Sequence, residues 1–323
     1  MIAALKQSDL YSRMKTSRLY DAYWTLRDRS RIDRRREEVN FYRSLLSGFP
    51  RGGLIFDVGA NRGDKTDVFL RLGARVVAVE PDQDSRRVLG QKFLQYRFAP
   101  KPVAIVGKAL SDRIGVETMW VDGPGSFLNT LSKKWVETLR GDKARFAHTS
   151  DKLEFAGRAD VETTTLEQLI TAHGSPFFIK IDVEGYEPVV LRGLQHPVPY
   201  LSYEVNLPEF RPEGLESVQV LSRLADDGTF NYIFDTKRGL CENRWLSPAE
   251  ISRVIERCSE KSIEVFWKTK GRQPLAEPTS VWPGREKQDP RPNLAWGILR
   301  AAKKKKEQQQ PRVPSNCCSQ SEG

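Results

Sequence analysis

The chain has 323 residues, of which 39% are hydrophobic and 29% charged, the composition of an ordinary soluble protein with room for one large or two small domains. It excludes collagen-like, mucin-like and disulfide-scaffold proteins. No apolar run approaches the roughly 18 residues of a spanning helix, and the N-terminus turns polar too early for a secretory signal. The four cysteines form no CxxC pair and no Cys/His array, so no zinc site is expected. These features predict a cytoplasmic protein.

The net charge of +10 raises the question of nucleic-acid binding, which depends on where the excess of basic residues lies. Residues 1–50 carry 11 Lys and Arg against 6 Asp and Glu, and residues 268–323 carry 12 against 5. The remaining residues, 51–267, carry 29 basic and 31 acidic side chains and are almost neutral. A DNA-reading domain would concentrate basic residues on the element that enters the groove. We therefore expect no specific nucleic-acid partner.

The two ends of the chain differ in character from the middle. Residues 1–50 predict a helical extension, because apolar side chains recur at spacings of three and four. These side chains are Leu10, Met14, Tyr20, Tyr23, Trp24, Val39, Tyr42, Leu45 and Leu46. We expect them to pack against the following domain; contact with a membrane surface is less favoured, because the charges of the segment alternate in sign. Residues 268–323, with seven prolines and a run of four lysines, predict a disordered basic tail. The oligomeric state is left open.

Residues 51–267 alternate between strand-like and helix-like segments. Strands are expected at 54–58, 75–80, 103–110, 177–182 and 200–205, and helices at 67–72, 84–96, 166–172 and 188–193. Such alternation implies an α/β domain with a doubly wound, mainly parallel, Rossmann-like sheet. Ligands of these sheets bind beyond the carboxyl ends of the strands, so the residues that follow each strand are the candidates for a site.

The first strand leads into the loop DVGANRGDKT, residues 57–66, whose glycines permit a sharp turn close to a ligand. The second strand ends at Glu80, 21 residues after Gly59, where a carboxylate can accept hydrogen bonds from both hydroxyls of a ribose. An adenosine-containing cofactor is therefore expected. A dinucleotide would need a third glycine where Asp64 stands, and this acid would repel a pyrophosphate. S-adenosylmethionine suits the loop better, because Asp57 offers a carboxylate to its ammonium group.

Five segments in order resemble the signatures of the FkbM-type S-adenosylmethionine-dependent methyltransferases: FDVGANRGDKT, VVAVEPD, KALSD, VETTTLEQLI and FIKIDVEGYEPVVLRGL. The part KIDVEGYEP, residues 180–188, is the most specific, because two-glycine loops recur in many folds. The resemblance covers about residues 53–205 and implies a class I methyltransferase fold, with hydroxyl groups of sugars or small metabolites as acceptors. It also implies cofactor contacts by Asp57, Gly59, Asn61 and Gly63 at the methionine moiety, Glu80 at the ribose, and Ser111 and Asp112 at the adenine.

Methyl transfer from a sulfonium requires alignment of the acceptor and removal of its proton. The strand 177–182 ends at Asp182, our first candidate for the base or the substrate-positioning carboxylate, and Glu184 follows two residues later. Glu204, at the end of the strand 200–205, is a further catalytic candidate. In the alternative, Asp182 only caps its turn and is neutralised by Lys180. Two acids within reach can also bind a divalent ion, but the spacing requires none, and no metal is predicted.

The segment 113–160 interrupts the alternation as an insertion. Its Gly-Pro-Gly-Ser turn and its aromatic residues Trp120, Phe127 and Trp135 suit a lid over the acceptor, although a solvent-exposed elaboration is an equal alternative. We expect O-methylation of a small-molecule or glycan hydroxyl, with nitrogen acceptors left open. Two other functions compete: a nucleotide-dependent oxidoreductase, disfavoured by Asp64, and a membrane or acid-surface adaptor that works through the basic ends.

Overall fold

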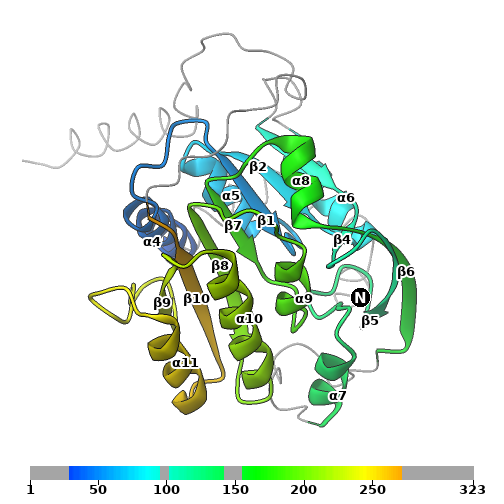
Figure 1. Cartoon of the computed structure of the whole chain (residues 1–323). Helices are drawn as coiled ribbons and strands as arrows, with labels where there is room; N and C mark the ends of the chain where they lie inside the picture. Colours follow the sequence, from blue (N-terminus) through cyan, green and yellow to red (C-terminus); the bar gives the residue numbers. More distant parts are fainter. Residues whose placement is uncertain (1–28, 95–101, 142–154, 271–323) are drawn as a thin grey trace, which may run out of the picture. The chain divides into compact units, whose positions relative to one another are not determined.

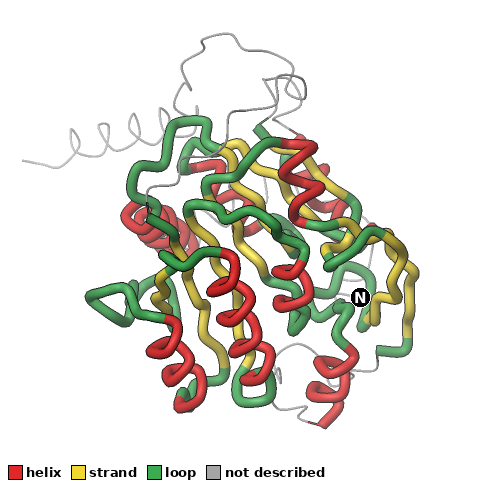
Figure 2. Tube along the Cα trace, in the orientation of Figure 1, coloured by secondary structure: helices red, strands yellow, loops and turns green. Residues whose placement is uncertain are grey.

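The computed structural model describes residues 29–94, 102–141 and 155–270 (Figure 1). The predicted stripe from Leu10 to Trp24 and most of the predicted tail lie outside these residues. Helices and strands alternate along most of the described chain (Figure 2). In chain order they are α4 (Arg29–Leu45), β1 (Leu54–Val58), α5 (Asp64–Arg71), β2 (Arg75–Val79), α6 (Gln83–Lys92), β3 (Val103–Val106), β4 (Ala109–Leu110), β5 (Gly115–Val121), α7 (Lys133–Gly141), β6 (Gly157–Thr164), α8 (Leu166–His173), β7 (Phe178–Ile181), α9 (Glu187–Arg192), β8 (Tyr200–Asn206), α10 (Arg211–Leu224), β9 (Thr229–Ile233), α11 (Pro248–Arg257) and β10 (Ser262–Lys268).

Within the described residues the central sheet has seven strands in the order β3-β2-β1-β7-β8-β10-β9. Its first five strands, β3, β2, β1, β7 and β8, are parallel, whereas β10 is antiparallel to both of its neighbours. The winding direction reverses between β1 and β7, which opens a crevice at the carboxyl ends of these two strands. The predicted doubly wound, mainly parallel sheet of class I methyltransferase type is confirmed. Strands β9 and β10 lie beyond the last strand that the sequence predicts.

Capping side chains determine where several helices begin. Asp82 accepts a hydrogen bond from the backbone amide of Ser85 at 2.7 Å and so starts α6. Thr165 accepts one from the amide of Gln168 at 3.1 Å and starts α8. Each cap typically stabilises its helix by about 1 kcal/mol. The helices predicted at 84–96 and 166–172 are therefore observed close to their expected starts.

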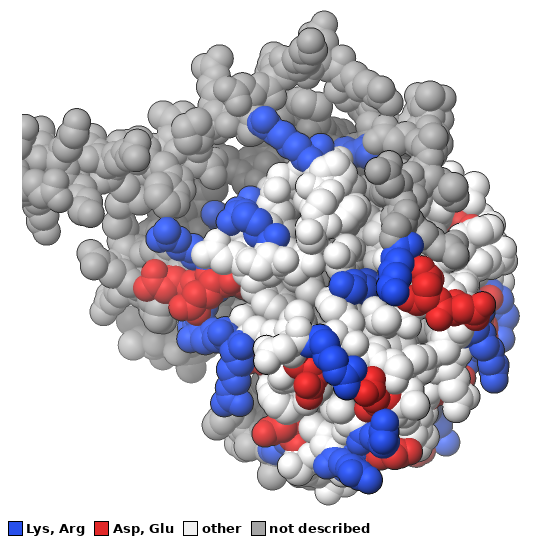
Figure 3. Space-filling model, turned by 60° about the vertical axis from the view of Figure 1, so that its left-hand side comes forward, with Lys and Arg blue, Asp and Glu red and all other residues white. Residues whose placement is uncertain are grey.

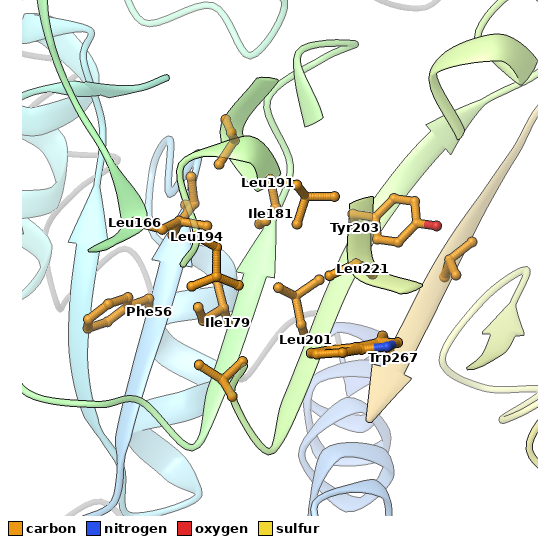
Figure 4. Close-up of a cluster of buried hydrophobic side chains, with 14 of the residues drawn as sticks. Phe56, Leu166, Ile179, Ile181, Leu191, Leu194, Leu201, Tyr203, Leu221 and Trp267 are labelled. Atoms are coloured by element: carbon orange, nitrogen blue, oxygen red, sulfur yellow. The ribbon is translucent and has the colours of Figure 1, made fainter. Parts of the chain in front are cut away.

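Helices cover both faces of the sheet, and apolar side chains along each strand alternate between the two faces. On β1, Phe56 belongs to the cluster beneath α8, α9, α10 and α11, whereas Ile55 belongs to the cluster beneath α4 and α5. Figure 4 shows part of the first cluster, in which Ile181 of β7 lies near Leu191 of α9 and Leu201 of β8 near Leu221 of α10. The two clusters thus pack on opposite faces of the sheet.

The helix α4 packs on the second layer. The side chain of Tyr42 is fully buried and meets the ring of Phe69 edge-on, with 5.1 Å between the ring centroids. Val39, Leu45 and Leu46 are also buried in this layer. The predicted packing of the N-terminal stripe against the following domain is confirmed for these four residues, which are the part of it that the structure describes.

The insertion forms a small sheet of its own, in the order β4-β6-β5 within the described residues. The single strand predicted for 103–110 is wrong in this respect: β3 pairs with β2 in the central sheet, whereas β4 pairs with β6 in the small one. Gly107 lies between the two short strands, where the chain leaves one sheet for the other. Trp135 of α7 fills the core beside the small sheet with Leu128, Leu139 and Phe210.

The described surface carries charges of both signs. On the face shown in Figure 3, Lys and Arg side chains are interspersed with Asp and Glu, and the described residues there form no extended region of one sign. Ion pairs such as Lys134 with Glu213, at 2.6 Å, account for part of this mixture. None of the described helices has the length and apolar character needed to cross a membrane.

Candidate functional site

The loop after β1 lies directly against the loop after β7 at the carboxyl edge of the sheet. Gly59 has a φ of 77°, and a Cβ at this position would lie 1.8 Å from the backbone carbonyl oxygen of Asp182. Residues with a side chain rarely adopt this φ, and no Cβ approaches a carbonyl oxygen so closely. Glycine at position 59 is therefore what allows the two loops to pack together. Gly59 and Asp182 both line a cleft at this point.

Gly63, the second glycine of the loop, is required by helix packing. Its φ is 75°, and a Cβ would lie 2.6 Å from the side chains of both Leu89 and Phe93 at α6. It is not among the residues that line the cleft. Asn61, between the two glycines, has a φ of 45° and does line the cleft. Glycine is thus required at position 59 for the contact between two loops and at position 63 for packing against α6.

Glu80 follows β2 and faces the loop after β1. Its carboxylate accepts hydrogen bonds from the backbone amides of Asn61 and Asp82, both at 2.8 Å, one on each oxygen. Burial raises the pKa of Glu80 to about 7, although the two amides oppose this shift. Each oxygen can accept a further hydrogen bond, and Glu80 lines the cleft. The geometry is therefore compatible with the ribose contact that the resemblance implies.

Three other residues implied by the resemblance lie away from this cleft. Asp57 is buried; its Oδ2 accepts a hydrogen bond from the Thr66 hydroxyl at 2.5 Å, and its Oδ1 has no partner among the described residues. Ser111 is buried and donates to Glu117 at 2.6 Å, and Asp112 forms ion pairs with arginine side chains. None of the three is in the lining of the cleft. Their contacts with the methionine and adenine moieties stay predictions.

The insertion forms part of the lining of this cleft. The residues that it contributes are Met119, Ser126, Phe127, Asn129, Thr130 and Leu131. The Thr130 hydroxyl donates a hydrogen bond to the carbonyl oxygen of Glu184 at 3.0 Å, and the amide of Gly125 donates one to Asp82 at 3.2 Å. The turn thus bridges the ends of β7 and β2. The insertion covers the side of the site that Glu80 lines, and its role as an acceptor lid stays a prediction.

Two of the aromatic residues considered for this lid serve other purposes. Trp135 is fully buried and meets Phe210 edge-on, with 5.5 Å between the ring centroids. The ring of Trp120 lies beneath the guanidinium of Arg158, 4.3 Å from its centroid. Of the three, Phe127, which is 44% exposed, is the one that lines the cleft.

Strand β7 leads into an ion pair. The ammonium of Lys180 lies 2.7 Å from Oδ2 of Asp182, and the Lys180 side chain is only 5% exposed. Burial by itself would raise the pKa of Asp182, but the Lys180 ammonium outweighs it and holds this pKa below its usual range. Asp182 is therefore a carboxylate at neutral pH.

The turn after Asp182 is held by Glu187, a carboxyl group that the sequence did not single out. Glu187 is buried and accepts hydrogen bonds from the amides of Val183 at 3.1 Å and Gly185 at 3.2 Å. Glu184, inside this turn, has a left-handed φ of 56° and lines the cleft. Burial and the charge of Asp182 raise the pKa of Glu184. An acidic residue in the first turn of a helix was the available signal for Glu187.

A second cavity, of about 280 Å³, adjoins the cleft. Its polar lining includes Lys65, Asp182, Glu204, Thr236, Ser262 and Glu264. Of the described residues, Asp182 alone lines both the cleft and this cavity. Lys180 pairs with Ser202 in the register of β7 and β8, and Glu204 pairs with Glu264 in that of β8 and β10. Alternation along the strands therefore brings the polar side chains to one face at the carboxyl edge.

Glu204 and Asp182, the two leading catalytic candidates, meet in this cavity. Both line it, and the proximity of Glu204 helps to lower the pKa of Asp182. Burial and the charge of Asp182 raise the pKa of Glu204, so that Glu204 keeps a proton under conditions in which Asp182 has lost its own. Chemically, the pair offers one carboxylate acceptor and one carboxyl donor.

The donor set of the cleft fits an adenosine cofactor without a pyrophosphate. The carboxylate of Glu80 can accept hydrogen bonds from two ribose hydroxyls. The first turn of α5 carries Asp64, paired with Lys92 at 2.7 Å, where a dinucleotide would place its phosphates. In the described part of the chain, no three His, Cys, Asp or Glu side chains are grouped so that they could hold a metal ion.

Comparisons with known proteins bear on this site. The family model described as the methyltransferase FkbM domain matches residues 57–222, just over half of the chain. No curated protein sequence matches the chain.

Three solved structures with a similar chain course are each 10% or less identical to this chain. A SAM-dependent methyltransferase from Agrobacterium tumefaciens is 9% identical with a TM-score of 0.36; the match covers 71% of this chain and 60% of that one, which is less than two thirds of its length. A TehB-like SAM-dependent methyltransferase from Corynebacterium glutamicum is 10% identical, with a TM-score of 0.36 and coverage of 72% and 88%. The plantazolicin methyltransferase BpumL in complex with SAH is 7% identical, with a TM-score of 0.35 and coverage of 80% and 93%.

Proposed function

Since this chain belongs to the FkbM family of S-adenosylmethionine-dependent methyltransferases, we propose that it methylates a hydroxyl oxygen of a sugar or another small metabolite. The cofactor is S-adenosylmethionine, and when bound it supplies an electrophilic methyl group with its leaving group attached. The protein then has two tasks, to align the acceptor and to receive a proton from it.

The observation that carries this proposal is the position of Asp182 between the two cavities. The cleft contains Gly59 and Glu80, which suit the cofactor, and the adjoining cavity contains the polar side chains that suit an acceptor. Asp182 lines both spaces, which supports the proposal that the acceptor oxygen meets the methyl group beside it. Asp182 is ionised at neutral pH, so it accepts a hydrogen bond from a neutral hydroxyl and receives its proton as the new bond forms.

Glu204 and Glu184 have supporting places in the proposal. Glu204 keeps its own proton and donates a hydrogen bond to Asp182, which holds the Asp182 carboxylate in one orientation. Glu184 lies on the cofactor side, where its left-handed backbone is fixed by the neighbouring turn. We assign the first role to Asp182 because it alone contacts both spaces.

The second cavity supports a small, polar acceptor. Its volume of about 280 Å³ is at the lower end of the range for small-molecule sites, about 300–1,000 Å³. Carboxylate, hydroxyl and ammonium groups line it beside Ile181, Ile233 and Phe234, and such polar groups bind hydroxyls by hydrogen bonds. A sugar or a related polyol meets these requirements better than a flat apolar ring does.

Calorimetric titration with S-adenosylhomocysteine tests the cofactor half of the proposal. The wild type should bind this ligand in the micromolar range, Glu80→Ala should bind it at least tenfold more weakly, and NAD should give no heat with either protein. Binding of NAD in place of S-adenosylhomocysteine would favour the oxidoreductase alternative. If neither ligand bound, the membrane or acid-surface adaptor would become the favoured function.

Transfer of a radioactive methyl group from S-adenosylmethionine tests the acceptor half. The assay uses a panel of sugars, polyols and their amino derivatives, with Asp182→Asn beside the wild type and Asp226→Asn as a matched control at an exposed position. We expect transfer to hydroxyls, a loss of about 10²–10⁴-fold in kcat for Asp182→Asn, and no change for Asp226→Asn. Product labelled on nitrogen, or unchanged turnover by Asp182→Asn, would contradict the proposal.

A further inference from the structure

Lys180 is an unusual residue to find inside a sheet. It lies in the middle of the central sheet, on β7 between β1 and β8, and its side chain is 5% exposed. An ammonium group is costly to remove from water unless carboxylates compensate it. The groups that face it are Asp182 on its own strand, Asp57 on β1 and Glu264 on β10. Because these acids favour its charged form, they raise the pKa of Lys180 and keep it an ammonium.

Among these acids, Asp182 holds Lys180 most directly. The 2.7 Å contact between Nζ and Oδ2 is a charge-assisted hydrogen bond. Glu264 is occupied on one oxygen by the Ser202 hydroxyl at 2.8 Å, and Asp57 by the Thr66 hydroxyl. Lys180 therefore acts on the carboxylate of the residue that lines both cavities.

Asp182 belongs to a crowded set of acids whose charges disfavour one another. The titratable and charged groups that face it are Lys180, Asp57 on β1, Lys65 on α5, Glu184 and Glu187 at α9, and Glu204 on β8. When several carboxyl groups lie this close, only some can be ionised at once, and the nearest cation decides which ones. Lys180 forms an ion pair with Asp182, whereas among the described residues Glu204 and Glu184 form none, although the charge of Lys180 also acts on both.

We propose that Lys180 is a positioning residue that keeps the negative charge of this carboxyl set on Asp182 and holds the carboxylate by its Oδ2 atom. Lys180 also lines the second cavity, but its proposed effect is on Asp182. As a catalytic statement the inference rests on the proposed function, because it assumes that Asp182 receives the acceptor hydroxyl. The location of the charge is testable without any acceptor.

The experiment is a carbon-13 NMR titration of the full chain, with label in the carboxyl groups of aspartate and glutamate. The resonances of Asp182 and Glu204 are assigned by their loss in Asp182→Asn and Glu204→Gln. In the wild type, Asp182 should ionise at a lower pH than Glu204. In Lys180→Met the pKa of Asp182 should rise by about 1–3 units, and in Lys180→Arg it should stay near the wild-type value. Lys133→Met removes an exposed lysine and should leave both resonances unchanged.

Either of two results overturns the proposal: Glu204 ionising before Asp182 in the wild type, or an unchanged Asp182 pKa in folded Lys180→Met. Should Lys180→Met fail to fold, as near-ultraviolet dichroism would show, the wild-type order of ionisation still decides. A failure of the proposed function looks different, because the titration would follow the expected order while no hydroxyl in the transfer assay was methylated. With an active acceptor, the acid limb of the pH profile of kcat should shift to higher pH in Lys180→Met and should stay at the wild-type pH in Lys180→Arg.

Discussion

Replacement of Gly59 by alanine tests whether the close approach of two loops builds the cofactor cleft. Alanine at a left-handed φ costs about 1–2 kcal/mol. The Cβ would also lie 1.8 Å from the carbonyl oxygen of Asp182, and relief of such a contact by backbone movement typically costs about 1–3 kcal/mol more. We therefore expect Gly59→Ala to destabilise the domain by about 2–5 kcal/mol and to weaken S-adenosylhomocysteine binding at least tenfold, because the loops that carry the cleft are forced apart.

Gly73 provides the matched control. Its φ is 87°, but a Cβ there would meet no atom within 4 Å, and it lies in the turn before β2, at the opposite edge of the sheet. Gly73→Ala should lose only the conformational part, about 1–2 kcal/mol, and should bind S-adenosylhomocysteine as the wild type does. Urea unfolding and calorimetric titration measure the two effects. Equal losses of stability with equal affinities in the two variants would refute the reasoning.

Two further predictions concern burial. The pKa of Glu80 is raised to about 7 in the folded state, whereas the unfolded chain releases this proton near the usual pKa of about 4.3. The free energy of unfolding should therefore fall as the pH rises from about 4.3 to about 7. Urea titrations at stepped pH should show a smaller fall in Glu80→Gln, and an identical fall would contradict the assignment. Trp135→Ala should cost about 3–5 kcal/mol, since this side chain is fully buried in the insertion, while Trp120→Ala, at a partly buried position, should cost clearly less in the same assay.

The sequence predicted the parts of the fold that depend on local pattern. Apolar runs and helical spacing located β1, β2, β7 and β8, because a strand or a helix repeats its own period whatever it later packs against. The rule that sites follow the carboxyl ends of parallel strands then pointed to Glu80, Asp182 and Glu204. These residues do lie at that edge, and Asp182 and Glu204 meet there.

What the sequence by itself determined was therefore the alternation of strands and helices that carries β1, β2, β7 and β8, the edge at which the candidate site lies, and the family of the protein. Only the tertiary structure decided that 103–110 serves two sheets, that β10 enters antiparallel beside β8, and that Asp57 does not line the cleft. It also decided that the pKa of Asp182 is lowered while that of Glu204 is raised. The reason is physical: pairing partners, the clash that demands glycine at 59, and the pKa of a buried acid all depend on groups distant in the chain, which local spacing does not specify.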